Sequence, residues 1–369
     1  MNIDSNIAIV CITQKGKTLA CNIRSLMKDG DIYFIQNKKD KNSSEGNRKV
    51  IQTSVENNIE LYIVNDRLKY LVEEIFDKYE YIVFIMATGI VIRTIAHLVN
   101  SKFSDPAILV TDEKGTNIIS LLSGHIGGAN EMTMHISELL GSNPVITTAT
   151  DVNKKSSLDM IAKKLDGYIE NFRDNVKDVN SMLINNKSVG LYIDGNYDID
   201  TRGFIILNNL NLDDKRYDSI VVVTNKSNLL ENNSIQNNRF IKLVPKDIVI
   251  GIGCRRNIDI ELLHNSLLDL LYNYNIDINS IKDIGSIEIK KDEKAIIELG
   301  KLLNVPFKTV SIEEISKIDY LFDKSDWVKK NIGVFSVAEP VAYILSDGNL
   351  IIEKQKYKGI TFSVGRVKL

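Results

Sequence analysis

The chain has 369 residues, 44% of them hydrophobic and 25% charged, a composition typical of a soluble globular protein with about two or three domains. The formal net charge of -2 gives no sign of nucleic-acid binding, and no apolar run approaches the ~18 residues that a membrane span needs. The three cysteines, Cys11, Cys21 and Cys254, are too widely spaced for a disulfide framework or a cysteine-based zinc site. The N-terminal residues show no signal-peptide pattern, so we expect a cytoplasmic protein.

Short apolar strands alternate with amphipathic helices over residues 1–150. Helices are predicted at 18–27, at 66–78 and from Gly89 onward, and strands at 6–13, 31–36, 60–65, 81–87, 107–112, 117–123 and 144–150. The polar stretch 37–48 is predicted to be a mobile surface loop. Strands separated by helices of this length are typical of βαβ units, so we predict an N-terminal α/β domain with a mainly parallel sheet.

The rest of the chain divides into two further predicted domains. In the smaller α/β middle domain, 151–240, Ser156 and Asp159 form a predicted capping box, strands follow near 188–195, 203–209 and 219–225, and an Asn-rich linker ends the domain. The C-terminal α/β domain, 241–369, is predicted to have a mainly parallel sheet with flanking helices. Its expected strands are 247–253, 283–289, 331–337 and a closing strand or hairpin at 350–367.

The segment Ser120–Asn130, SLLSGHIGGAN, holds the densest set of chemical groups in the sequence. It is predicted to be the end of a strand that passes through His125 into a helix at Gly127 and Gly128. Glycines at such a turn let the backbone approach a ligand, and the free N–H groups of a helix start favour a carboxylate or phosphate. We expect His125 to lie at the carboxyl edge of the parallel sheet, where open α/β folds bind ligands. The alternative is a tight turn with a structurally bonded histidine.

Other segments of the N-terminal domain carry weaker signals. Gly89 and Arg93 form a second strand–glycine–helix turn, in which the arginine either binds a carboxylate or lies on the surface. Asp105 precedes a proline and could make an Asx turn. The threonines at 147 and 148 could hydrogen-bond a ligand or simply favour a strand. The remaining histidines, His97, His135 and His264, lie in predicted helices and are set aside.

In the C-terminal domain, the turn Gly251–Arg256, GIGCRR, lacks the third glycine of a dinucleotide-binding fingerprint, so NAD binding is not expected. A glycine turn with two arginines suits a carboxylate-rich ligand better. Cys254 is interpreted either as a nucleophile or as a small turn residue. Glu293 and Glu339 could be helix caps or acid–base groups.

Two co-linear groups of motifs resemble the cobalt-precorrin-5A hydrolase family of anaerobic cobalamin biosynthesis. They are GIVIR, KFSDPAILVTDEKG, SLLSGHIGGAN and VITTATD over about 85–150, then GIGCRRN, SIEIKKDE and VFSVAEPVA over about 248–365. The resemblance implies that water opens a ring-A acetate δ-lactone of cobalt-precorrin-5A and that a two-carbon unit leaves as acetaldehyde, giving cobalt-precorrin-5B. It implies no metal or cofactor held by the protein itself, because cobalt arrives with the substrate.

Under this hypothesis His125 is the base, with Glu131, Asp151 and Glu339 as proton carriers. His125 could instead ligate the substrate cobalt, and the lactone could open by direct water attack or through an acyl-enzyme on Ser123. The backbone N–H groups of Gly127 and Gly128 are the hypothesised oxyanion donors. The predicted substrate-binding residues are Gly89, Arg93, Asp105, Ser123, Gly124, Gly127, Gly128, Asn130, Thr147, Thr148, Gly251, Gly253, Cys254, Arg255 and Lys290.

Two other functions fit the same motifs. A tetrapyrrole-binding or escort protein without chemistry of its own would need the same glycine turns and basic residues. A nucleotide-binding α/β protein is less favoured, because the glycine fingerprint is incomplete. The expected partner is a small cobalt-corrinoid substrate, with no nucleic acid and no membrane; a homodimer and transient contacts with neighbouring pathway enzymes are compatible with the sequence.

Overall fold

The computed structural model describes residues 6–36, 51–56, 59–101, 104–125, 127–149, 153, 155–211, 214–229, 240–323, 329–330 and 332–369. The predicted surface loop at 37–48 and the predicted proton carrier Asp151 lie outside these residues. Two compact units divide the chain at residues 154 and 155. None of the helices in the described part of the chain is long and apolar enough to cross a membrane.

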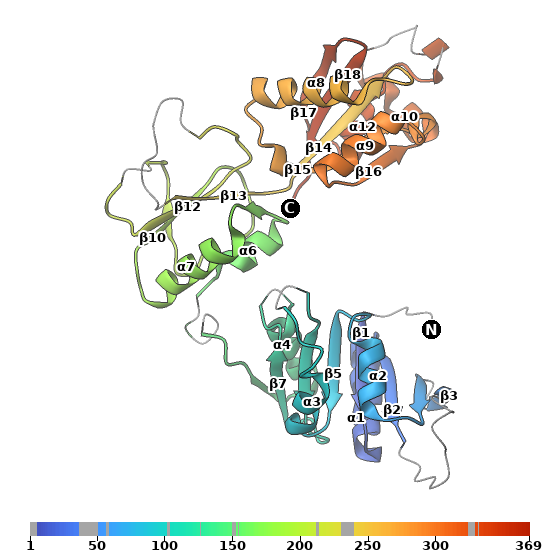
Figure 1. The fold of residues 1–369 in the computed structure, drawn as a ribbon, viewed down its shortest axis with the longest axis vertical. Helices are drawn as coiled ribbons and strands as arrows, with labels where there is room; N and C mark the ends of the chain where they lie inside the picture. The colour runs from blue at the N-terminus through green and yellow to red at the C-terminus, as the bar shows by residue number, and fades with distance from the viewer. Residues whose placement is uncertain are drawn as a thin grey trace. The chain divides into compact units, whose positions relative to one another are not determined.

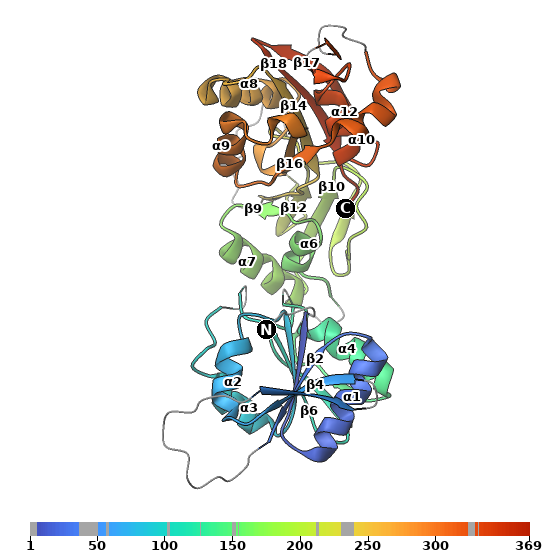
Figure 2. The ribbon, with the colours of Figure 1, turned by 90° about the vertical axis from the view of Figure 1, so that its right-hand side faces the viewer.

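The first unit is built on a sheet whose described strands number eight, in the order β3-β4-β2-β1-β5-β6-β7-β8 (Figures 1 and 2). The strands are β1 (Ile7–Cys11), β2 (Asp31–Ile35), β3 (Ile51–Glu56), β4 (Ile59–Val64), β5 (Tyr81–Ile85), β6 (Ala107–Thr111), β7 (Asn117–Leu122) and β8 (Asn143–Val145). The five central strands, β4 to β6 in the sheet order, are mutually parallel, as the βαβ pattern predicts.

Helices cover both faces of this sheet, because side chains of successive strand residues point to opposite faces. Helices α2 (Leu68–Ile75) and α3 (Thr88–Ile95) pack on the face that carries Ala8 and Val10. Helices α1 (Gln14–Met27) and α4 (Ala129–Leu140) pack on the face that carries Ile7 and Ile9, and Figure 2 shows the two pairs on opposite sides. The result is a three-layer α/β unit with an apolar core on each face.

The second unit contains two further sheets. The first has the order β11-β10-β12-β13-β9, with strands β9 (Tyr168–Ile169), β10 (Val189–Ile193), β11 (Ile205–Leu207), β12 (Ser219–Val223) and β13 (Phe240–Val244). It is parallel except for β9, and helices α6 (Leu158–Lys164) and α7 (Phe172–Ile184) bury their apolar residues against one face. Its strands lie within 168–244, and they belong to the same compact unit as the sheet that follows.

The second sheet has the order β16-β15-β14-β18-β17. Its strands are β14 (Ile248–Cys254), β15 (Ile281–Ile287), β16 (Phe307–Val310), β17 (Leu350–Tyr357) and β18 (Ile360–Arg366). β14, β15 and β16 are parallel, whereas β17 and β18 form the closing hairpin and run antiparallel to their neighbours. The sheet is therefore mixed, with its parallel half built from βαβ connections.

Helices also cover both faces of the second sheet. Helices α8 (Ile260–Asn273) and α9 (Lys294–Leu303) bury leucines and isoleucines against one face. Helices α10 (Ile312–Ile318) and α12 (Ala338–Leu345) lie on the other, as Figure 2 shows. Short 3₁₀ turns connect these elements, η1 (Ile278–Ser280), η2 (Glu288–Lys290) and η3 (Asp319–Leu321).

Asp247 links the two sheets of the second unit. Its side chain is fully buried and accepts hydrogen bonds from Tyr197 Oη at 2.7 Å and Asn225 Nδ2 at 3.1 Å. Arg366 Nε forms an ion pair with it at 3.4 Å. Burial raises the pKa of this carboxyl above its ordinary value, although all three partners oppose that shift. This buried carboxyl thus contacts residues from three separate segments.

Two local predictions are wrong. The first is the capping box at Ser156. The N-cap of α6 is Ser157, and its side chain makes no cap hydrogen bond. The Asp159 carboxylate accepts a hydrogen bond from Asn180 Nδ2 at 2.7 Å. The second is the strand at 331–337, whose described residues form no strand. Val334 and Val337 are buried against α10 and α12 while the Phe335 N–H donates to the Asp319 carboxylate, so the apolar run fills a core without pairing in a sheet.

Candidate functional site

The turn that carries His125 lies at the edge opposite to the one predicted. β7 runs antiparallel to β6, with Leu122 beside Ile108, so the end of β7 meets the start of β6. The turn Ser123–Asn130 (hereafter the histidine turn) therefore lies at the amino edge of the parallel strands. The apolar pattern of a strand gives its location but not its direction, which explains the error.

Close packing explains the glycines of the histidine turn. A Cβ on Gly127 would lie 2.6 Å from the Ser123 carbonyl oxygen, and one on Gly124 would lie 2.7 Å from Asn130 Oδ1. Gly128 has φ +85°, and its Cβ would lie 2.9 Å from the hydroxyl of Tyr81. Real Cβ atoms do not come this close, so each position favours glycine independently of any ligand.

The backbone of the histidine turn satisfies the first N–H groups of α4. The N–H of Ala129 donates to Ser123 O at 3.2 Å, and that of Asn130 donates to Gly124 O at 3.0 Å. The Gly128 N–H donates to His125 O at 2.9 Å, so in this conformation it is not available as the hypothesised oxyanion donor. The turn thus caps its own helix.

Polar side chains join the histidine turn to neighbouring segments. Asn130 is buried, accepts from Ser120 Oγ at 2.6 Å and donates to Thr148 Oγ1 at 2.9 Å. Ser123 is buried with φ +57°, and its Oγ donates to the Asp105 carbonyl at 3.0 Å. These hydrogen bonds bring together four of the predicted binding residues, Asn130, Thr148, Ser123 and Asp105. The same hydrogen bonds occupy polar groups that a ligand would need.

The Asp105 carboxylate is committed to its own turn. It accepts from the N–H groups of Asn100 at 2.9 Å and Ser101 at 3.0 Å, which precede it in the chain. An Asx turn bonds the N–H two residues further on, so the carboxylate is occupied by a different turn from the one predicted as the alternative. His125 is half-buried, while Glu131 in the first turn of α4 and Thr147 are exposed. Among the predicted chemical groups at this edge, these three side chains are the more accessible ones.

Gly89 and Arg93 lie at the other edge of the same sheet. α3 begins directly after β5, at the carboxyl edge, and Arg93 Nη1 donates back to Gly89 O at 2.9 Å. The structure therefore does not bring Arg93 together with His125. A mainly apolar hollow of about 520 Å³ opens there, between β1 and β5 where the strand order reverses, and includes Thr13, Thr88 and Asp112.

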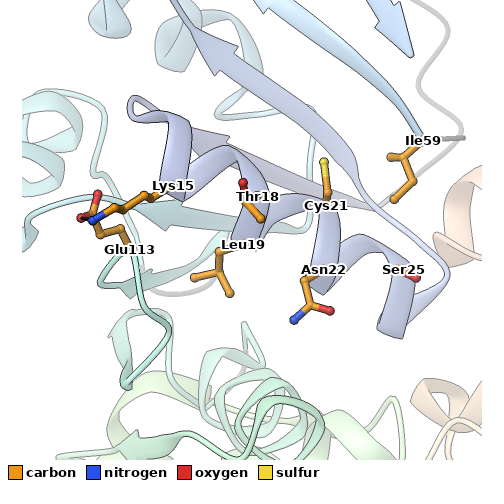
Figure 3. Close-up of a pocket in the computed structure, with 8 residues that line it drawn as sticks. All are labelled: Lys15, Thr18, Leu19, Cys21, Asn22, Ser25, Ile59 and Glu113. Atoms are coloured by element: carbon orange, nitrogen blue, oxygen red, sulfur yellow. Dashed lines mark ion pairs between the residues drawn. The ribbon is translucent and has the colours of Figure 1, made fainter. Parts of the chain in front are cut away.

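Another hollow of the first unit runs along α1, where Lys15, Thr18, Leu19, Asn22 and Ser25 line one side of it (Figure 3). Its volume is about 670 Å³, and Lys15 and Glu113 form a long ion pair of 3.9 Å at one end. Both of these side chains are exposed, so water screens the pair. The hollow offers no set of converging charges.

A basic cavity of about 810 Å³ lies beside α12 in the second unit. The ends of β14 and β15, the segment before α12 and the β17–β18 hairpin form its walls. Five basic side chains line it together with one acidic side chain among the described residues: Arg255, Arg256, Lys290, Lys354, Lys356 and Asp323. We call this space, with these residues, the basic cavity.

Three of the cations in the basic cavity form internal ion pairs. Lys290 and Glu293 are both nearly fully buried and lie 3.0 Å apart, so each charge compensates the other. Lys354 pairs with Glu339 at 3.3 Å, and its backbone N–H donates to the same carboxylate. Arg256 donates to Asp292 at 3.1 Å.

The predicted residues of the C-terminal domain meet at this cavity. Gly253, Cys254, Arg255 and Lys290 line it, and Glu339 contacts the lining residues Ser336 and Lys354. Gly251 does not line it: a Cβ there would overlap the carbonyl oxygen of Ala338, so this glycine lets α12 pack on β14. Burial raises the pKa of the Cys254 thiol to about 11, which keeps it protonated near neutral pH.

The lining residues that the sequence did not assign to a site include Lys354, Lys356 and Phe335. The alternation of Lys354 and Lys356 in a strand places both on one face, which is a readable signal. Phe335 stands in the segment mistaken for a strand, so its role could not be read. No group of three or more His, Cys, Asp or Glu residues among those described is arranged to hold a metal ion.

Comparisons with known proteins cover most of the chain. Three family models match in order: "Cobalamin synthesis G N-terminal" at residues 70–151, "Cobalamin biosynthesis central region" at 156–237 and "Cobalamin synthesis G C-terminus" at 248–365. A Salmonella typhimurium protein named cobalt-precorrin-5A hydrolase is 41% identical over 79% of this chain and 83% of its own length. A protein of the same name from Priestia megaterium is 29% identical over 98% of this chain and 94% of its own.

One solved structure was also found to be similar. The crystal structure of a cobalamin biosynthesis protein G homologue from Sulfolobus solfataricus is 24% identical and covers 98% of this chain and 97% of that one, with a TM-score of 0.39.

Proposed function

The chain belongs to the cobalamin synthesis G family, and from this premise we propose that it is a cobalt-precorrin-5A hydrolase of anaerobic cobalamin biosynthesis. The proposed reaction opens the ring-A acetate δ-lactone and releases the two-carbon unit as acetaldehyde, giving cobalt-precorrin-5B. We propose a cytoplasmic enzyme with no cofactor of its own, whose partner is the small cobalt-corrinoid substrate.

The basic cavity is the observation that supports this proposal most directly. Cobalt-precorrin-5A is a small molecule with many carboxylates, and the cavity gathers five basic side chains in a chain whose net charge is -2. Its volume of about 810 Å³ lies in the range of small-molecule sites. Cations on the wall of such a site form charge-assisted hydrogen bonds with carboxylates.

The lactone chemistry is assigned to the histidine turn as part of this proposal. His125 takes a proton from water, the water oxygen bonds to the lactone carbonyl carbon, and the bond from that carbon to the C20 oxygen breaks. Loss of the proton from the freed C20 hydroxyl then breaks the bond between C20 and the ring, which yields acetaldehyde and a protonated ring carbon. Glu131, in the first turn of α4, is the candidate within the same unit for moving these protons.

The test is acetaldehyde release from cobalt-precorrin-5A under anaerobic conditions, trapped and quantified with purified protein. His125→Ala should lower the rate by about a hundredfold or more, the usual contribution of a general base. His135→Ala is the matched control, because His135 is an exposed histidine ten residues further along, within α4. Unchanged turnover in His125→Ala would exclude His125 both as base and as cobalt ligand.

An escort protein is the alternative outcome of the same experiment. It would bind cobalt-precorrin-5A tightly without releasing acetaldehyde. Absence of both binding and release would refute the proposed function altogether.

A further inference from the structure

Two cations of the basic cavity are not used by its internal ion pairs. Arg255 and Lys356 are exposed and line the cavity, and within the described residues neither has a carboxylate partner. The other three lining cations are each held by a carboxylate of the protein, as set out above. A ligand anion can therefore pair with Arg255 and Lys356 without first displacing a protein carboxylate.

We propose, resting on the proposed function, that the basic cavity binds the peripheral carboxylates of a corrinoid through Arg255 and Lys356, with its apolar wall against the edge of the macrocycle. The other three cations stay paired with carboxylates of the protein, position the cavity walls and add to its positive lining. This assigns to the second unit a corrinoid-binding site that holds substrate and product alike.

Arg255 and Lys356 belong to different segments, the residue after β14 and strand β17. Gly253, Thr361 and Lys356 stand in register across β14, β18 and β17, so Lys356 lies two strands from Gly253, roughly 10 Å away. Arg255 follows β14 and lies against the hairpin turn, where a Cβ on Gly359 would be 3.5 Å from Arg255 Cδ. Two cations held by separate segments can each pair with a different carboxylate on the margin of one ring.

The cavity lacks the features of a phosphate site. Phosphate sites usually gather free backbone N–H groups of a glycine turn at a helix start. Here the Arg255 N–H donates to Gly359 O at 3.3 Å, and Arg256 replaces the third glycine. The turn is therefore committed to the hairpin.

The basic cavity also has an apolar lining. It is formed by Ile287 at the end of β15, Ile289 in η2, and Ile332, Phe335 and Val337 from the segment before α12. The Lys329 ammonium lies 3.9 Å from the centre of the Phe335 ring, which fixes that ring by a cation–π contact. A corrinoid has an apolar ring and charged margins, and the cavity offers a surface for each.

Dicyanocobyrinic acid, a stable corrinoid heptacarboxylate without a lactone, is a suitable probe, and its heptamethyl ester is the uncharged control. Binding to the full chain is measured by isothermal titration calorimetry at two salt concentrations. The variants are Arg255→Met and Lys356→Met, with Lys358→Met as the matched control, since Lys358 is an exposed hairpin lysine that does not line the cavity. Melting curves establish that each variant is folded.

We expect the acid to bind the wild-type chain and the Lys358→Met variant equally. Arg255→Met and Lys356→Met should each weaken binding roughly tenfold or more, the value of one charge-assisted hydrogen bond. The ester should bind at least as weakly as these variants, and added salt should weaken binding of the acid. Wild-type affinity in both cavity variants, equal affinity for acid and ester, or no binding by the wild type would each overturn the proposal.

The acetaldehyde assay separates this proposal from the proposed function. Acetaldehyde release without cobyrinic acid binding would refute the cavity assignment and leave the hydrolase intact. Binding with the expected variant pattern but no acetaldehyde release would do the reverse.

Discussion

Gly251→Ala tests whether this glycine serves packing or ligand binding. An added Cβ would overlap the Ala338 carbonyl oxygen and would lie 2.8 Å from the Ala342 nitrogen, both backbone atoms of α12. Backbone atoms cannot rotate away as a side chain does, so α12 must retreat from β14 by about 1 Å or more to restore ordinary contact. The expected cost is near the upper end for overpacked cores, about 3 kcal/mol.

That cost is large enough to measure by thermal unfolding. For a unit of this size, about 3 kcal/mol lowers Tm by roughly 6–12 °C. The first turn of α12 carries Glu339, so the shift should also disturb the ion pair with Lys354 and weaken corrinoid binding. Gly89→Ala is the control, because a Cβ there meets only the flexible Arg93 guanidinium, and its helix should be unchanged or slightly stabilised.

The result that refutes this reasoning is a Gly251→Ala variant that melts within about 1 °C of the wild type. If that variant also lost corrinoid binding, Gly251 would be a ligand contact, as the sequence predicted. A large drop in Tm supports the packing role.

Three further experiments test Asp247, Cys254 and Ser123. Burial raises the pKa of the Asp247 carboxyl, so the folded state binds its proton more tightly than the unfolded state does. This group therefore stabilises the folded state at pH values below its unfolded pKa. That contribution is lost as the pH rises through its folded pKa. Urea unfolding should therefore show the wild type gaining stability relative to Asp247→Asn as the pH falls from 7 towards 4, and a constant difference would contradict the shift. With a thiol pKa of about 11, Cys254 should react with iodoacetamide at pH 8 at least a hundredfold more slowly in the native chain than after unfolding. Mass spectrometry measures the rate of labelling. Fast labelling of the native chain would restore the nucleophile hypothesis. Ser123→Ala removes the buried hydrogen bond to the Asp105 carbonyl. It should lower the free energy of unfolding, measured by chemical denaturation, by about 1 kcal/mol and leave acetaldehyde release intact. Loss of acetaldehyde release at unchanged stability would indicate an acyl-enzyme.

Much of the fold could be predicted from the sequence, because buried parallel strands are continuous apolar runs and the helices between them have clear periodicity. The α/β class and the strand–helix order of the first unit follow from these patterns. The direction of β7 could not be predicted, since an apolar strand reads alike both ways, and this alone moved His125 from one sheet edge to the other. The segment at 331–337 failed because a buried apolar run need not pair as a strand.

Site residues could be predicted where their charge determines the role, and could not be predicted where packing determines it. Arg255 could be assigned to an anion site from its charge beside a glycine turn, and it lines the basic cavity. Gly251 looks the same in sequence but serves helix packing, which becomes visible only when α12 is placed on β14. Lys356 reaches the cavity from a strand about a hundred residues away, through a pairing that local patterns do not encode.

The reversed direction of β7 separates two parts of the first unit that the sequence places close together. With parallel strands of five residues, such as β5, the two edges of the sheet lie about 17 Å apart. Sites at that separation with no shared partners contribute additively to free energy. The edge that holds Arg93 is therefore free to diverge, or to be redesigned for another ligand, without disturbing the turn that holds His125.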